Sequence, residues 1–301
     1  MHKRNLGYHL LIGILVTIMI GSSALVVKEL YKYKKGTDLY KKISEDYVED
    51  DGENTTPTED DDQLITPPQI DHAGLAAQNS DYIGWLRIEA CNIDYPVVIG
   101  KTNDDYIHTG FNKEYVYAGT LFVDYENQRD FSDPNTILYG HNMRNRSMFG
   151  NLRNFLDSDF ATTNHSFWLC TKDYSYLYEI YSIAVVRVEG SAFTLFSKFD
   201  EKYAEYVSER VQGSAITIGI TPDEEARTLT LSTCYGPGVN GNRLIIQAYR
   251  SGAYPSEGCT QTQAEWNERS LRVREDKIRE ARLKKEAKKK KAKSAVEESY
   301  E

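Results

Sequence analysis

Eight short runs rich in Val, Ile, Thr, Tyr and Phe lie within residues 73–253 and restrict what this part of the chain can fold into. The runs are separated by segments that contain Gly, Asn, Asp or Pro, which is typical of strands joined by turns. The predicted strands are 85–90, 95–99, 120–124, 136–139, 167–171, 176–188, 227–233 and 244–249. This count suits a closed barrel or a sandwich, so the expected fold class is mainly β.

Three helices are expected to flank these strands, over residues 73–78, 147–156 and 198–212. In the last two, apolar and aromatic residues recur at helical spacing: Met148, Leu152 and Phe155 in one, and Phe199, Tyr203, Tyr206 and Val207 in the other.

An uncharged apolar run of 18 residues, 10–27, is close to the length of about 20 residues that crosses a bilayer. It predicts an N-terminal transmembrane helix after a short cytoplasmic segment, residues 1–9. A cleaved signal peptide is the alternative, with small residues at Ser22, Ser23 and Ala24. The anchor is favoured because the apolar run continues through Val27.

Polar segments lie on both sides of the predicted barrel. Residues 28–72 are read as an acidic polar linker, since residues 38–62 hold eleven acidic residues and bury too little apolar surface to fold alone. Residues 254–301 form a basic tail, in which residues 266–293 hold thirteen Lys or Arg against five acids. The tail is either a solvated helix or disordered segment, or a polybasic arm for anionic polymers or lipid.

The four cysteines, Cys91, Cys170, Cys234 and Cys259, fit no zinc-binding spacing. No metal or cofactor is expected. Two disulfides are one interpretation. Buried free thiols are the other, since Cys91 and Cys170 lie in apolar, strand-like runs.

Cys234 ends the alternating strand 227–233 and precedes a glycine-rich loop, where a thiol can react. A structural cysteine at a strand end is equally consistent with the spacing.

Arg243 follows Cys234 nine residues later in the sequence. If a hairpin joins the two, this cation favours the thiolate and donates to a developing oxyanion; a surface arginine is the alternative.

His141 follows the apolar strand 136–139 at a glycine, where an imidazole could exchange protons with an amine. The remaining histidines are weaker candidates. His108 and His165 in particular lie in polar loops with no strand leading to them.

Together these segments resemble the sortases. The likeness covers residues 76–250 and rests on the LSTC motif at residues 231–234, Arg243 downstream, and the strand ending YGHN at residues 139–142. Class B is indicated by NSDYIGWLRI, IDYPVV, the run YGHNMRNRSMFGNLRNF and the helix 198–212. One departure is the loop 235–242, which lacks the acidic residue that class B relatives often carry there.

The resemblance implies an eight-stranded closed barrel on the extracellular face of a Gram-positive cell, although the lysines that follow the span favour the opposite orientation by charge alone. It also implies cysteine transpeptidation by Cys234, His141 and Arg243. Ser232 and Thr233 flank the nucleophile and are expected to line the substrate groove. The expected partners are exported proteins that carry a C-terminal sorting motif and a peptidoglycan cross-bridge amine; no nucleic acid is expected. The alternatives are a pilin polymerase that uses a lysine acceptor, a hydrolytic cysteine protease, and an inactive wall-binding module.

Overall fold

The computed structural model describes residues 3–49, 64–65, 67–236, 241–256 and 261–262. A closed barrel forms its centre, with strand order β10-β11-β9-β8-β4-β5-β6-β7. The expected eight-stranded barrel is therefore confirmed. Its strands are β4 (Tyr82–Ile88), β5 (Ile93–Ile99), β6 (Leu121–Val123), β7 (Asn135–Tyr139), β8 (Ser166–Cys170), β9 (Tyr174–Arg187), β10 (Thr228–Cys234) and β11 (Asn242–Pro255).

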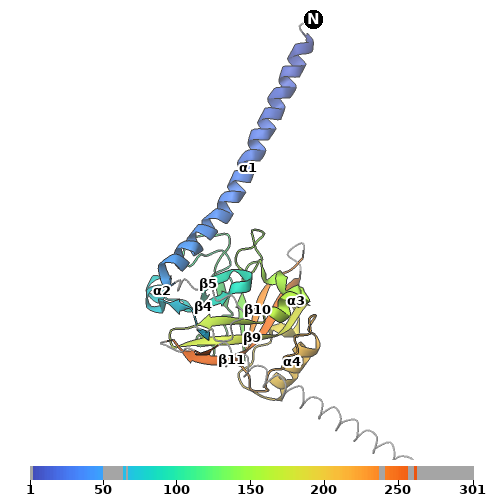
Figure 1. The fold of residues 1–301 in the computed structure, drawn as a ribbon. Coiled ribbons are helices and arrows are strands. Elements are labelled where there is room, and N and C mark those ends of the chain that lie inside the picture. Colours follow the sequence, from blue (N-terminus) through green and yellow to red (C-terminus); the bar gives the residue numbers. More distant parts are fainter. Residues whose placement is uncertain (1–2, 50–63, 66, 237–240, 257–260, 263–301) are drawn as a thin grey trace, which may run out of the picture.

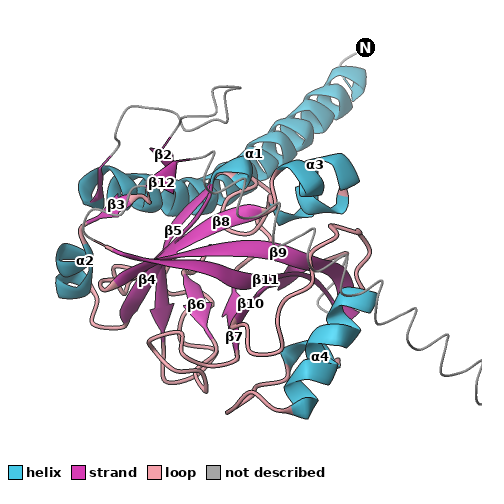
Figure 2. Ribbon diagram, turned by 60° about the horizontal axis from the view of Figure 1, so that its bottom comes forward, coloured by secondary structure: helices cyan, strands magenta, loops and turns pink. Residues whose placement is uncertain are grey.

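Helices and short strands surround the barrel (Figures 1 and 2). The helices are α1 (Lys3–Tyr47), α2 (His72–Gln78), α3 (Ser158–Thr163) and α4 (Glu201–Gln212), with 3₁₀ turns η1 (Glu89–Cys91), η2 (Leu152–Leu156) and η3 (Ser191–Phe193). Two short pairs lie outside the barrel: β1 (Val48–Glu49) with β3 (Gln69–Ile70), and β2 (Leu64–Ile65) with β12 (Gln261–Thr262).

Both faces of strand β10 are buried, for different reasons. Leu229 and Leu231 belong to the apolar core. The hydroxyl-bearing face is covered by α4, whose Tyr203 hydroxyl contacts Thr228 Oγ1 at 3.2 Å. A polar strand face is thus buried while Thr228 and Tyr203 keep hydrogen-bond partners.

The helix predicted over 147–156 is wrong in its first half. Arg146 and Met148 have positive φ angles of 65° and 52°, which break a right-handed helix. Only the 3₁₀ turn η2 forms there. The Asp157 side chain then accepts from Phe160 N at 2.9 Å and caps α3, a helix that the sequence pattern did not indicate.

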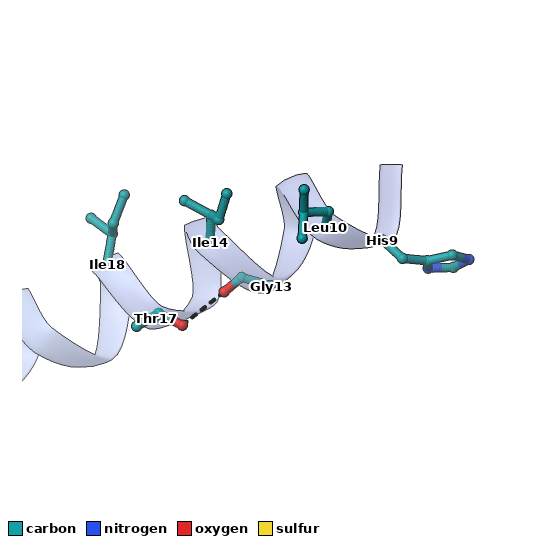
Figure 3. Close-up of a pocket in the computed structure, with 6 residues that line it drawn as sticks. All are labelled: His9, Leu10, Gly13, Ile14, Thr17 and Ile18. Carbon is teal, nitrogen blue, oxygen red and sulfur yellow. Dashed lines mark hydrogen bonds between the residues drawn. The ribbon is translucent and has the colours of Figure 1, made fainter. Parts of the chain in front are cut away.

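Helix α1 carries the apolar segment and projects away from the barrel (Figure 1). It is long and apolar enough to cross a membrane, with a mean hydropathy of 2.6 over its most apolar window. Along this segment Leu10, Ile14 and Ile18 point to one side of the helix, and Thr17 Oγ1 donates to Gly13 O at 2.9 Å (Figure 3).

Part of the range expected to be a polar linker, 28–72, is folded and packed against the barrel. Helix α1 continues to Tyr47, and Tyr40 and Ile43 are 4% and 3% exposed because they pack against the barrel. The Tyr40 hydroxyl also binds Gly119 O and, at 2.8 Å, Thr120 Oγ1. Residues 50–63 of the linker and 263–301 of the tail lie outside the described residues.

Candidate active site

Strands β7 and β10 lie side by side and run parallel, so they end at the same edge of the barrel. Their register pairs Ser232 with Tyr139, and Gly140 N donates to Ser232 O at 3.1 Å. Cys234 and His141 each follow this pair by two residues. Cys234 and His141, which are far apart in the sequence, therefore follow equivalent positions of two paired strands at the same edge of the barrel.

The β10–β11 hairpin supplies Arg243. Its Cα is paired with that of Cys234 across the antiparallel ladder, and Tyr235 N donates to Asn242 O at 3.0 Å. The antiparallel arrangement that would bring Arg243 opposite Cys234 is therefore present. Cys234 lies between the strand end that leads to His141 and the strand start that carries Arg243.

Cys234 is exposed, whereas Cys91 and Cys170 are buried free thiols. Burial raises the pKa of both buried thiols to about 12, so neither forms a thiolate readily. The buried-thiol interpretation therefore holds for these two residues, and Cys259 lies outside the described residues.

The His141 ring is held by a backbone carbonyl: its Nε2 lies 2.7 Å from Ile107 O. Because a carbonyl only accepts, Nε2 carries the proton and Nδ1 is the open nitrogen of the neutral ring. Burial lowers the pKa of His141, the Ile107 hydrogen bond opposes this, and the charge of His108 lowers it further. These effects together favour the neutral form of the His141 ring.

Three residues at the site were not expected from the sequence. The His108 ring stacks on His141, with centroids 5.3 Å apart. Asn142 Nδ2 donates to Cys234 O at 2.7 Å, and Arg153 Nη2 donates to Asn142 Oδ1 at 2.9 Å. Asn142 could have been found from the sequence, because it is the last residue of the YGHN motif. No feature of the sequence indicated that the loop carrying His108 lies beside His141.

Ser232 and Thr233, the predicted groove residues, are 1% and 3% exposed. The Thr233 hydroxyl donates to Gly140 O at 2.8 Å and so ties β10 to the segment that carries His141. Neither hydroxyl is exposed to a substrate in this structure, which differs from the predicted groove lining.

Within the described ranges, no group of three or more His, Cys, Asp or Glu side chains is arranged to hold a metal ion. The chemistry that this edge of the barrel supports is that of a thiol, an imidazole and a guanidinium.

The chain matches the sortase domain family over residues 86–251. Sortase B of Listeria monocytogenes is 36% identical over 180 residues, which make up 58% of this chain and 71% of that protein. The structure of Clostridium perfringens sortase B is 35% identical with a TM-score of 0.56, and the match covers 60% of this chain and 99% of that one. The structure of sortase B from Bacillus anthracis in complex with AAEK1 is 25% identical with a TM-score of 0.61, over 73% of this chain and 98% of that one.

The family match covers more than half of the chain, and the barrel has the same fold as these sortase B structures. A sortase is a transpeptidase, and the features of the sequence that indicate class B agree with these relatives. The chain belongs to the sortase family.

Proposed function

We propose that this transpeptidase works through a thioacyl enzyme formed on Cys234. The observation that carries the proposal is the position of this exposed thiol, at the barrel edge where the ends of β7 and β10 meet and opposite Arg243. A thiol, a base and a fixed cation in one place are the groups that acyl transfer through cysteine requires.

In the first half-reaction, Nδ1 of His141 takes the thiol proton while Sγ of Cys234 attacks the carbonyl carbon of a Thr residue in the substrate. The C–S bond forms, and Arg243 donates hydrogen bonds to the oxyanion. The C–N bond then breaks, and the proton on Nδ1 passes to the departing amine.

In the second half-reaction, an acceptor amine attacks the thioester and gives its proton to Nδ1 of His141. The new C–N bond forms, the C–S bond breaks, and the sulfur recovers the proton. The scheme is ping-pong, and it returns Cys234 and His141 to their starting states.

The donor substrate that we propose is an exported protein with a C-terminal sorting motif, and the acceptor is a peptidoglycan cross-bridge amine. A solved sortase B complexed with triglycine, 26% identical to this chain, supports an acceptor that ends in a glycine amine. We place residues 10–27 in the membrane as a single span, with the barrel on the outer face of a Gram-positive cell.

The test is peptide transfer by the full-length chain in detergent. A library of five-residue peptides with Thr fourth is incubated with triglycine, with Nα-acetyl-lysine, or with no amine, and the products are identified by mass spectrometry. We expect transfer to triglycine, with a thioacyl adduct of Cys234 trapped when no amine is present.

Cys234→Ala is expected to lower transfer by about 1,000-fold or more, while Cys91→Ala is its matched control. Equal rates for Cys234→Ala and the wild type would refute the mechanism. Preferred transfer to the lysine amine would instead identify a pilin polymerase. Hydrolysis that no amine diverts would identify a protease, and no product from any peptide would favour a wall-binding module.

A further inference from the structure

His108 and His141 form a stacked pair whose ring planes differ by 12°. Each ring also donates to a backbone carbonyl of the loop between β5 and β6. His108 Nδ1 lies 3.0 Å from Tyr117 O, and His141 Nε2 lies 2.7 Å from Ile107 O. Since a carbonyl only accepts, both hydrogen bonds specify a tautomer as well as a ring orientation.

The stack continues beyond His108 to helix α1. Tyr117 lies parallel to His108 with centroids 5.6 Å apart, and Tyr33 meets Tyr117 edge to face at 5.9 Å. Lys32 Nζ lies 5.5 Å from the centre of the Tyr117 ring. A continuous row of rings therefore joins the docked part of α1 to His141.

A second set of contacts holds the loop on the other side of His141. Asn145 Nδ2 lies 3.4 Å from Thr37 Oγ1 of α1, and Met148 N donates to Tyr95 Oη at 3.2 Å. Tyr95 in turn meets Tyr40 of α1 edge to face at 5.4 Å. Helix α1 thus contacts or supports both loops that flank His141.

We propose that His108 is a positioning residue for His141, and that the row of rings from Tyr33 through Tyr117 and His108 holds the His141 imidazole with Nδ1 open to the reacting groups. This inference rests on the proposed function, because it takes His141 as the group that moves the proton. His108 itself touches no reacting atom in this scheme.

The stack also bears on the charge of His141. A positive charge on the neighbouring ring disfavours a second positive charge on His141 and so lowers the pKa of that ring. The other titratable or charged groups on the surrounding elements are Lys32 and Lys35 on α1, Glu114, Tyr115 and Tyr117 on the loop, Arg153 after β7, Cys234 on β10 and Arg243 on β11. Among the described residues, His108 is the charged group whose interaction with His141 shifts the pKa of that ring.

Two substitutions of His108 separate its two roles. His108→Phe keeps a ring for stacking and removes the titrating nitrogens, whereas His108→Ser removes both. Because His108 is exposed, both variants should fold. His165→Ser is the matched control, since the His165 Nδ1 also lies close to a backbone carbonyl, 2.9 Å from Thr162 O.

The measurements are ¹⁵N NMR of the His141 ring in the full-length chain, assigned with His141→Gln, and the pH profile of transfer from the library's best peptide to triglycine. For His108→Phe we expect the His141 titration and the acid limb of kcat/KM to move together to higher pH, because the repelling charge is gone. For His108→Ser we expect the same shift, a mixed tautomer signal, and a fall in kcat of about two- to ten-fold with KM unchanged.

An unchanged His141 tautomer, titration and kcat in both variants would overturn the inference. A fall in KM alone, or the same changes in His165→Ser, would also count against it. The two proposals fail separately: activity of Cys234→Ala would refute the mechanism, while the NMR titration of His141 tests the role of His108 without any turnover.

Discussion

Arg243, the proposed oxyanion donor, is held at the barrel edge by the backbone rather than by a partner side chain. Its Cα is fixed opposite that of Cys234 by the hairpin. Within the described residues its guanidinium makes one hydrogen bond, from Nη1 to Asn242 O at 3.3 Å. Its other N–H donors remain available to a substrate oxygen, in the fork geometry that lysine lacks.

We predict that Arg243→Gln lowers kcat about 100-fold or more, because a donor to the developing oxyanion is lost. Arg243→Lys should recover part of this loss, since it restores the charge but not the fork. Single-turnover formation of the Cys234 thioacyl adduct measures both variants. Arg187→Gln is the control, because Arg187 is an exposed arginine at the neighbouring end of β9. A loss confined to KM would contradict the oxyanion role.

His72 on α2 is a buried histidine whose titration is expected to make the stability of the barrel depend on pH. Burial lowers its pKa to about 4, against the charges of Asp71 and Asp173. Its Nδ1 lies 2.7 Å from Tyr82 Oη, which joins α2 to β4. In the unfolded chain the pKa of His72 is about 6.5, and in the folded chain it is about 4. Between these two pH values the unfolded chain binds more protons than the folded chain, so the folded state loses stability as pH falls through this range.

We therefore predict that the free energy of unfolding falls from about pH 6.5 to about pH 4, and that His72→Gln flattens this fall because glutamine does not titrate. Urea unfolding at a series of pH values measures the slope, with His165→Gln as the control. Parallel curves for the wild type and His72→Gln would show that another group causes the pH dependence.

At the scale of elements, α1 has two different parts. Beyond the apolar segment, the residues that face the barrel recur at alternating spacings of three and four: Tyr33, Gly36, Tyr40, Ile43 and Tyr47. This is the spacing of one helix face. Gly36 allows close approach, because a Cβ there would lie 3.2 Å from Ala118 Cβ. The acidic residues close to this stripe in the sequence led composition alone to predict a polar linker here instead of a helix that packs against the barrel.

We predict that the docked part of α1 belongs to the folded domain. A chain that begins at Lys28 should keep the full stability of the barrel, and one that begins at residue 50 should lose several kcal/mol. Tyr40→Ala should cost about 3–5 kcal/mol, since it removes a buried aromatic side chain. Tyr31→Ala is the control, because Tyr31 is on the same helix and is 67% exposed. Equal unfolding midpoints for the two chains would mean that this part of α1 contributes nothing.

At the scale of the whole molecule, one helix carries both the candidate span and the contacts to the barrel (Figure 1). No break separates these two parts, since α1 runs from Lys3 to Tyr47. The row of rings described above extends from the same helix to His141. If residues 10–27 cross a membrane as proposed, helix geometry rather than a coil would set the distance and direction of the site from that membrane.

We predict that the protein resists extraction from membranes by alkaline carbonate and that a chain beginning at Lys28 does not. In intact protoplasts, an added protease should digest the barrel while a cytoplasmic marker protein survives. The lysines after residue 27 oppose this orientation, but large domains can be exported despite such charges. A barrel that is digested only after permeabilisation would reverse the proposed topology.

The sequence by itself determined the local features of the fold, namely the strands and turns, which depend on residues that are neighbours in the chain. Strand patterns predicted the barrel strands, and the nine-residue spacing of Cys234 and Arg243 was compatible with a hairpin, because turns and ladders are local. The family resemblance then indicated His141 as the third member of the site.

Only the tertiary structure decided which distant segments meet. The parallel pairing of β7 with β10 brings Asn142 to the Cys234 carbonyl, and the loop before β6 brings His108 onto His141. Both contacts depend on barrel closure, which pairs strands far apart in sequence and leaves no periodic signal in either segment. The residues of α1 that face the barrel recur at helical spacing in the sequence. The barrel surface against which they pack forms only when the barrel closes. The sequence and its family resemblance thus indicated Cys234 as the candidate nucleophile, while the contacts of His141 with His108 became visible only in the folded chain.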